Sequence, residues 1–209
     1  MIPAIFLAAG ASSRMGRTKA LLPLPGGESF LARLTRTFTD AGADPVVCVA
    51  GFDADALRLE VERRQLPARL AVNPDPGRGQ LSSLVTGLDA VAAQKPAAVL
   101  VVPVDLPLVT VTTVRQVIST WLSSGAPIVR PTRGGRHGHP VLLAARLFAE
   151  FRCADPSLGA RAVIQRHLAE IVDVAVDDPG AFDDVDTPEE YERLIGLRTP
   201  HSSERAGTE

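Results

Sequence analysis

Short apolar runs alternate along this chain with longer segments in which apolar residues recur every three or four positions. The short runs are apolar throughout, which is typical of β-strands covered by helices on both faces. The predicted strands span residues 4–8, 45–50, 70–72, 97–104, 127–129 and 171–176. The predicted helical faces lie within residues 30–38, 84–92 and 114–122. We therefore expect a three-layer α/β fold with a mostly parallel sheet and right-handed crossovers.

Turn-forming residues lie where this alternation requires them, at Gly42, residues 73–77 and Gly125. Residues 130–140 are polar and rich in glycine, which predicts a loop. Residues 186–190 predict a helix start, because they combine a capping residue, an early proline and acidic side chains. We expect one domain over residues 1–196 and a polar, disordered tail over residues 197–209.

Composition excludes several classes of protein. The chain has 209 residues, 45% of them apolar and 22% charged, and its net charge is −2. A single globular domain fits these values, whereas sequence-independent nucleic-acid binding requires a basic field. No apolar run is long enough to span a membrane, and the N-terminus lacks the basic start of a signal peptide, so we expect a cytoplasmic protein. Cys48 and Cys153 are the only cysteines, which excludes a disulfide framework and a cysteine zinc site.

The loop after the first predicted strand, residues 7–19, has the composition of an anion-binding site. It combines small residues, two serines and two arginines with Lys19, one of only two lysines in the chain. Small residues let backbone N–H groups approach a phosphate closely, and the cationic side chains offset its charge. The loop contains neither a Walker motif nor GxGxxG, and an ordinary solvated turn remains the alternative.

Two aspartates are candidate metal ligands. Asp105 follows the apolar run 97–104 directly, so it lies at the carboxyl end of a buried strand, on the same edge as the loop 7–19. Mg²⁺ typically takes one or two protein carboxylates together with phosphate oxygens. Asp184 and Asp186 are candidates for the second carboxylate. The structural alternatives are a turn role for Asp105 and a helix N-cap role for Asp186.

The loop sequence resembles the signature of the MobA/MocA-like NTP transferase family, and most closely that of its molybdenum cofactor cytidylyltransferases. The matching elements are Leu7-Ala8-Ala9-Gly10, Ser13-Arg14-Met15-Gly16, Lys19 and Leu21-Leu22-Pro23. The resemblance implies a Rossmann-like nucleotidyltransferase fold. It also implies nucleotide contacts at Leu7, Ala8, Ala9, Gly10, Arg14, Lys19, Asn73, Gly79, Gln80 and Ser83.

Later segments of the chain are similar to the same family. Residues 182–190 resemble its D-[IV]-D-T-P-E-[DE] element, which implies that Asp186 joins Asp105 in binding Mg²⁺. Catalysis would then depend on Lys19, Arg14 and Asp105. The family carries a Gly-His-Pro element where this chain has residues 138–140, on the acceptor side of the site. The implied contacts to the acceptor's phosphate come from His139 and Arg136, with Arg130 and Arg133 as further candidates.

The resemblance implies transfer of CMP from CTP to the phosphate of molybdopterin, with release of pyrophosphate. Guanylyltransferase relatives carry a glycine where this chain has Ala9, and asparagines where it has Asp184 and Asp186, so we favour CTP. The expected recipient of the product is a molybdoenzyme or its chaperone. The alternatives are GTP as donor, a sugar or polyol phosphate as acceptor, and a non-catalytic molybdenum cofactor carrier.

Overall fold

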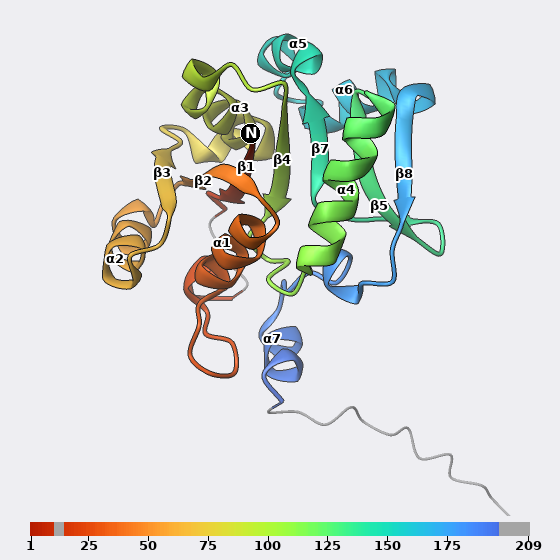
Figure 1. Cartoon of the computed structure of the whole chain (residues 1–209). Helices are drawn as coiled ribbons and strands as arrows, with labels where there is room; N and C mark the ends of the chain where they lie inside the picture. The colour runs from red at the N-terminus through yellow and green to blue at the C-terminus, as the bar shows by residue number, and fades with distance from the viewer. Residues whose placement is uncertain (11–14, 197–209) are drawn as a thin grey trace, which may run out of the picture.

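The computed structural model describes residues 1–10 and 15–196, and in this part of the chain eight strands form one sheet (Figure 1). The strands are β1 (Ile2–Ala8), β2 (Ala43–Ala50), β3 (Ala68–Val72), β4 (Ala98–Pro103), β5 (Ile128–Arg133), β6 (Arg136–His137), β7 (Val141–Ala144) and β8 (Ile171–Ala175). Their order is β3-β2-β1-β4-β7-β5-β6, with β8 beside β5. Strands β1 to β4 run parallel, and β7 runs antiparallel to β4 and β5, so the sheet is mostly parallel as predicted.

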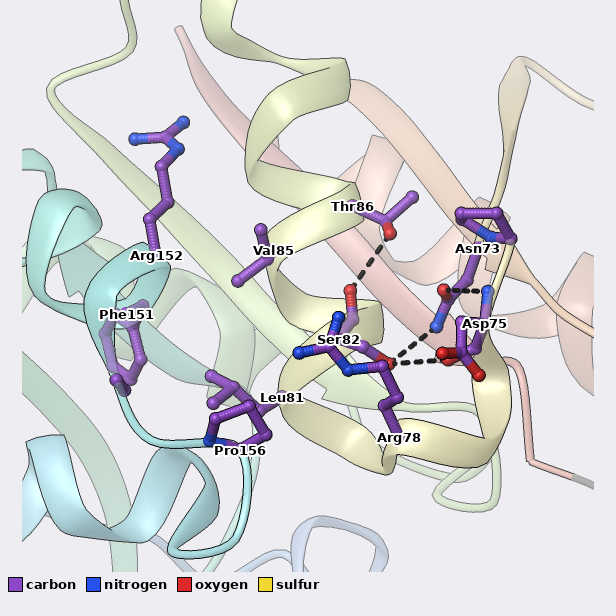
Figure 2. A pocket seen from close by; sticks show the side chains of 12 residues that line it. Asn73, Asp75, Arg78, Leu81, Ser82, Val85, Thr86, Phe151, Arg152 and Pro156 are labelled. Carbon is purple, nitrogen blue, oxygen red and sulfur yellow. Dashed lines mark hydrogen bonds between the residues drawn. The ribbon is translucent and has the colours of Figure 1, made fainter.

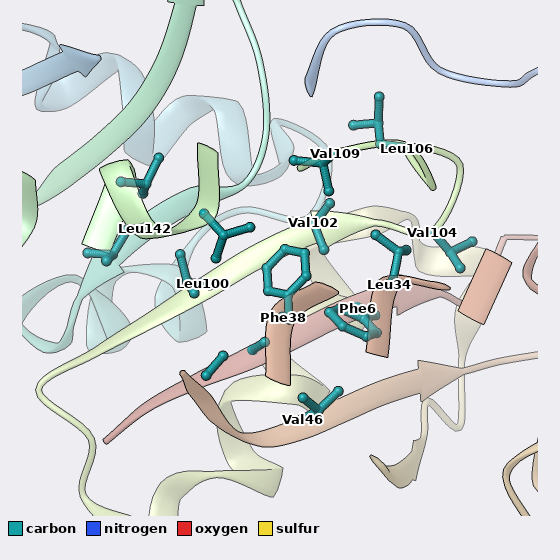
Figure 3. Close-up of a cluster of buried hydrophobic side chains, with 14 of the residues drawn as sticks. Phe6, Leu34, Phe38, Val46, Leu100, Val102, Val104, Leu106, Val109 and Leu142 are labelled. Carbon is teal, nitrogen blue, oxygen red and sulfur yellow. The ribbon is translucent and has the colours of Figure 1, made fainter. Parts of the chain in front are cut away.

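Helices cover both faces of the sheet. They are α1 (Phe30–Asp40), α2 (Ala54–Arg64), α3 (Gln80–Ala90), α4 (Val111–Ser124), α5 (Phe148–Cys153), α6 (Gly159–Arg166) and α7 (Pro188–Leu194). Helices α1 and α4 pack on one face, where the rings of Phe6 and Phe38 lie 5.1 Å apart (Figure 3). Helices α3, α5 and α6 pack on the other face, against Ile5 and its neighbours. Adjacent residues of β1 are thus buried on opposite faces, which explains the continuously apolar runs.

The prediction of a loop over residues 130–140 is wrong in part. Strand β5 continues to Arg133 and pairs with β6, so that Thr132 lies opposite His137. Gly134 and Gly135 form the turn between these strands, with φ of 56° and 79°. Polar side chains hid the hairpin, because β6 is exposed at the edge of the sheet. Strand β7 was not predicted either, although its residues are apolar.

The last helix begins one residue later than an Asp186 cap would place it. Thr187 caps α7, accepting a hydrogen bond from the N–H of Glu190, whose side chain accepts one from the N–H of Thr187 in return. This reciprocal capping box leaves the carboxylate of Asp186 available for other contacts. The predicted tail, residues 197–209, lies outside the described residues. Among the described helices none is long and apolar enough to cross a membrane.

Candidate active site

The carboxyl ends of the parallel strands bring several predicted site residues to one edge of the sheet. Ala8, Ala50 and Val72 are in register at the ends of β1, β2 and β3. The N–H of Val104, just after β4, donates to the carbonyl of Leu7 at 3.1 Å. The loops that follow these strands therefore emerge side by side, in the place where open α/β sheets bind their ligands.

At this edge Lys19 lies between two carboxylates that are far apart in the sequence. Its Nζ donates to Oδ2 of Asp105 at 3.2 Å and also to Oδ1 of Asp186. Lys19 opens the short helix η1 (Lys19–Leu21), which is anchored by the buried side chain of Ala20. The Lys19 side chain is 14% exposed, so its contacts with the carboxylates are partly shielded from water. The sequence predicted all three residues as site members, and the structure places them together.

The charge of Lys19 offsets part of the cost of burying the Asp105 carboxylate. Burial raises the pKa of this carboxyl, the charge and hydrogen bond of Lys19 oppose the rise, and the charges of Asp186 and Asp184 add to it. Two carboxylates held this close remain ionised together only with positive charge between them. Among the described residues no group of three or more acidic, histidine or cysteine side chains forms a ready-made metal site. A metal held by Asp105 and Asp186 would complete its coordination with water and with phosphate oxygens of a ligand.

Backbone contacts hold Asp186 beside Asp105. The N–H of Val185 donates to the carbonyl of Asp105 at 2.9 Å, and the N–H of Asp186 donates to the Glu190 side chain at 2.7 Å. Helix α7 is fixed in turn by Tyr191, whose hydroxyl donates to the carbonyl of Pro23 at 2.7 Å. The segment that follows Lys19 and the segment that carries Asp186 are thereby locked together.

Asp178 is a buried residue that sequence analysis missed, and it links the segment containing Asp186 to the loop containing Asp105. Its Oδ2 accepts hydrogen bonds from the N–H and the hydroxyl of Thr110 and from the hydroxyl of Thr113, at 2.6–2.9 Å. Its Oδ1 accepts one from the N–H of Gly180 at 3.1 Å. A β-carbon on Gly180 would lie 2.3 Å from the backbone of Leu108, so only glycine fits this approach. The signal in the sequence was the Asp-Pro-Gly turn at residues 178–180.

Replacing Asp178 with alanine should lower the free energy of unfolding by about 3 kcal/mol, because several buried donors lose their acceptor at once. Urea unfolding of the variant and the parent protein measures this loss. The matched control is Asp177→Ala, since the Asp177 side chain is 91% exposed and its ion pair with Arg133 lies on the surface. Equal losses for the two variants would show that the Asp178 network does not stabilise the fold.

A pocket of about 350 Å³ opens beside the Lys19 cluster. Asp105 and Asp186 line it together with Gln80, at the start of α3, and His139, which precedes β7. Residues predicted from the resemblance to contact the nucleotide, the metal and the acceptor thus share one pocket. Arg14, predicted to bind phosphate, lies outside the described residues.

His139 is neutral at physiological pH. Burial lowers its pKa to about 4, because the imidazolium would lose its hydration. The backbone N–H of His139 donates to the carbonyl of Ala181 at 2.8 Å. This hydrogen bond fixes the loop before β7 against the segment containing Asp186. At neutral pH the imidazole can therefore meet an acceptor's phosphate as a hydrogen-bond donor and not as a cation.

The protein should lose stability as the pH falls from about 6.5 to about 4, because the unfolded chain protonates His139 in this range and the folded chain does not. The loss attributable to this residue is at most about 3 kcal/mol, from the difference between the two pKa values. Urea unfolding at pH 7.5 and pH 4.5 measures it in the parent protein and in His139→Gln. The glutamine variant should be the less acid-sensitive of the two; equal sensitivity would contradict the assignment.

The arginines predicted to meet the acceptor's phosphate are each paired with a carboxylate. Arg136 contacts Asp183 at 3.3 Å, donates to the carbonyl of Phe182 at 2.9 Å and lies over its ring. Arg130 and Arg133 pair with Asp173 and Asp177 in the same region, at 2.7 and 3.0 Å. These partners come from β8 and the residues after it; the strand itself was predicted, but its place beside β5 was not. A role of Arg136 in binding the acceptor stays a prediction.

The predicted nucleotide-binding segment after β3 is held by the side chain of Asn73. Asn73 is 4% exposed, and its amide donates to the hydroxyls of Ser82 and Ser83 at 2.9 and 3.0 Å. These bonds lie at one end of a second pocket, of about 240 Å³, that runs along α3 towards Phe151 (Figure 2). Because the amide of Asn73 donates to side chains of the protein itself, its role is to hold the loop that leads to Gln80. Gln80 is exposed.

Of the loop after β1, the residues up to Gly10 are described before a gap at residues 11–14. Ala9 is 4% exposed, and a β-carbon on Gly51 would lie 3.0 Å from the methyl group of Ala9 and 2.5 Å from its carbonyl oxygen. Leu7 and Ala8 belong to β1, whereas Gly10 is exposed with open space around it. The methyl group of Ala9 therefore packs against the turn after β2.

Residues 4–171 match the family model described as the MobA-like NTP transferase domain. Over 205 residues the chain is 34% identical to nicotine blue oxidoreductase from Paenarthrobacter nicotinovorans, covering 93% of this chain and 96% of that protein. Over 201 residues it is 33% identical to a molybdenum cofactor guanylyltransferase from Rhizobium meliloti, covering 90% and 88%.

A solved structure of Rv0371c from Mycobacterium tuberculosis H37Rv superposes with a TM-score of 0.76 and 25% identity, covering 94% of this chain and 98% of that one. Another structure of that protein, described as a complex with manganese, gives a TM-score of 0.72 at 24% identity, with coverage of 94% and 99%. These similarities confirm the fold predicted from the sequence, and the chain belongs to the family of MobA-like NTP transferase domains.

Proposed function

We propose that this protein transfers CMP from CTP to the phosphate of a molybdopterin-type acceptor and releases pyrophosphate. The observation that carries the proposal is the placement of Lys19 between Asp105 and Asp186, beside a pocket of about 350 Å³. This combination of one cation and two carboxylates is suited to a triphosphate with its divalent metal, which together bring both signs of charge to the site.

The reaction requires no protein nucleophile, since an acceptor phosphate is already ionised. One of its oxygens forms a bond to the α-phosphorus of CTP while the bond to the bridging oxygen breaks, and pyrophosphate leaves with the electron pair. Lys19 would stabilise the charge that develops on pyrophosphate, and His139 would donate a hydrogen bond that orients the acceptor. Asp105 and Asp186 would hold Mg²⁺, which when bound supplies charge stabilisation across the phosphates.

The choice of CTP rests on the resemblance in residues 184–186. Aspartates stand at positions 184 and 186, where guanylyltransferase relatives carry asparagines. The methyl group of Ala9 is packed against Gly51 and does not add to this argument. The Rhizobium meliloti relative is named a guanylyltransferase, which makes GTP the competing donor to be tested beside CTP.

A second candidate function is an oxidoreductase activity. It is favoured by the match to nicotine blue oxidoreductase, which extends over 93% of this chain. Against it stands the Lys19 cluster, since a redox reaction of an organic compound needs no pair of carboxylates with a cation between them. A carrier that holds a molybdenum cofactor without transferring a nucleotide would need no such cluster either.

Mg²⁺-dependent release of pyrophosphate tests the proposal, with CTP and GTP assayed in parallel, each with and without molybdopterin. We expect release with CTP that depends on both the acceptor and the metal. Release with GTP alone would change the donor, and release only with a sugar or polyol phosphate would change the acceptor. No release with any acceptor, together with oxidation or reduction of nicotine blue by the protein, would replace the proposal by the second candidate.

A further inference from the structure

Phe52 differs in burial from every other phenylalanine of the chain. The other six, all among the described residues, are at most 8% exposed, whereas Phe52 is 64% exposed. They are Phe6, Phe30, Phe38, Phe148, Phe151 and Phe182. Burial of an aromatic ring stabilises a fold, and the ring of Phe52 does not gain this stabilisation. The ring is therefore available to contact a ligand.

The turn that carries Phe52 emerges between two segments predicted to bind the nucleotide. It follows β2, which lies between β1 and β3 and ends at Ala50, in register with Ala8 and Val72. One neighbour is thus the loop after β1, and the other is the loop that begins at Asn73. Phe52 stands at the carboxyl edge of the sheet, where the ligand of an open α/β fold is bound.

Close backbone contacts fix this turn on both sides. Gly51 approaches Ala9 so tightly that a β-carbon would lie 2.5 Å from the Ala9 carbonyl oxygen. On the other side, the N–H of Asn73 donates to the carbonyl of Ala50 at 2.8 Å. The residue after Gly51 therefore has a defined place next to both nucleotide segments, which suits a preformed contact.

We propose that Phe52 stacks on the nucleobase of the bound NTP; the inference rests on the proposed function, because it takes an NTP as the ligand. A phenyl ring offers a flat apolar face to a planar heteroaromatic ring, and such stacking accepts any base. Phe52 thus contributes affinity for a nucleotide over a bare phosphate chain, while hydrogen bonds elsewhere select the base. Lys19 holds the other end of the ligand, so base and triphosphate are bound by different parts of the sheet edge.

Binding of CTP and of inorganic tripolyphosphate, measured by calorimetry with Mg²⁺, separates stacking from phosphate binding. Phe52→Ala should weaken CTP binding about 10-fold and leave tripolyphosphate binding unchanged, and Phe52→Tyr should bind both as the parent does. The matched control is Leu59→Ala on α2, because Leu59 is 65% exposed and lies on the helix that follows the turn. The control should bind both ligands as the parent does.

Two results would overturn the inference: unchanged CTP affinity in Phe52→Ala, or equal weakening of CTP and tripolyphosphate, which would indicate a structural defect. Unfolding midpoints of all variants are measured alongside, and an exposed ring should leave them unchanged. The proposed function fails separately, when the parent protein binds CTP but releases no pyrophosphate with any acceptor. A parent protein that binds neither CTP nor GTP would overturn both.

Discussion

Replacing Asp105 with asparagine should reduce pyrophosphate release at least about 100-fold while the protein stays folded. The substitution keeps the size of the side chain and removes the charge that faces Lys19 at 3.2 Å. It also removes one of the two carboxylates available to Mg²⁺, so the loss should appear in kcat at saturating CTP. The assay is Mg²⁺-dependent pyrophosphate release, with urea unfolding as the check on folding.

The comparison variant is Asp184→Asn, which removes a carboxylate from the same pocket. Asp184 is exposed, whereas Asp105 and Asp186 both accept hydrogen bonds from Lys19. Loss of the Asp184 carboxylate should therefore cost much less activity. Full activity of Asp105→Asn would contradict the mechanism. A larger loss in Asp184→Asn than in Asp105→Asn would move the metal site to the other carboxylate.

Replacing Lys19 with methionine should also lower turnover at least about 100-fold, because the leaving pyrophosphate loses the ammonium group that offsets its charge. Without that ammonium group, Asp105 and Asp186 face each other with less positive charge near them. The variant should therefore gain more thermal stability from added Mg²⁺, in the absence of nucleotide, than the parent protein does. Differential scanning fluorimetry over a Mg²⁺ titration measures this second effect.

Lys95→Met is the matched control, since Lys95 is the only other lysine and lies after the short helix Ala92–Gln94, away from the pocket. It should change neither turnover nor the response to Mg²⁺. If Lys19→Met retained full turnover, Lys19 would have no part in the reaction. If its stability responded to Mg²⁺ as the parent's does, Lys19 and the metal would not share the two carboxylates.

The layered fold was predictable because burial dictates the pattern of the strands. Ile5 and Phe6 are adjacent in sequence and buried on opposite faces, so β1 reads as a continuous apolar run. Asp105 was predictable for the same reason, as it follows such a run at the carboxyl edge. The resemblance to the family predicted that Asp186 lies with Asp105. The structure adds the hydrogen bond from the N–H of Val185 to the carbonyl of Asp105, which holds the two residues side by side.

The remaining features depend on contacts between distant segments, which no local pattern records. Asp178 is 68 residues from Thr110, and its turn-like sequence gives no sign of the hydrogen bonds to α4. The hairpin of β5 and β6 is polar because it is exposed, so it resembles a loop. The contacts of Arg130 and Arg133 with an acceptor stay a prediction, and the sequence did not show that β8 and the residues after it bring carboxylates beside both arginines.

Transfer of label from CTP tests the central claim most directly. The protein is incubated with CTP labelled at the α-phosphorus, Mg²⁺ and molybdopterin, and the product is isolated and its labelled group identified. We predict that the parent protein transfers the label to a cytidine dinucleotide of molybdopterin. Asp105→Asn should form at least about 100-fold less of this labelled product in the same time. Recovery of the label only as unreacted CTP, from a protein that binds both substrates, would contradict nucleotidyl transfer to this acceptor.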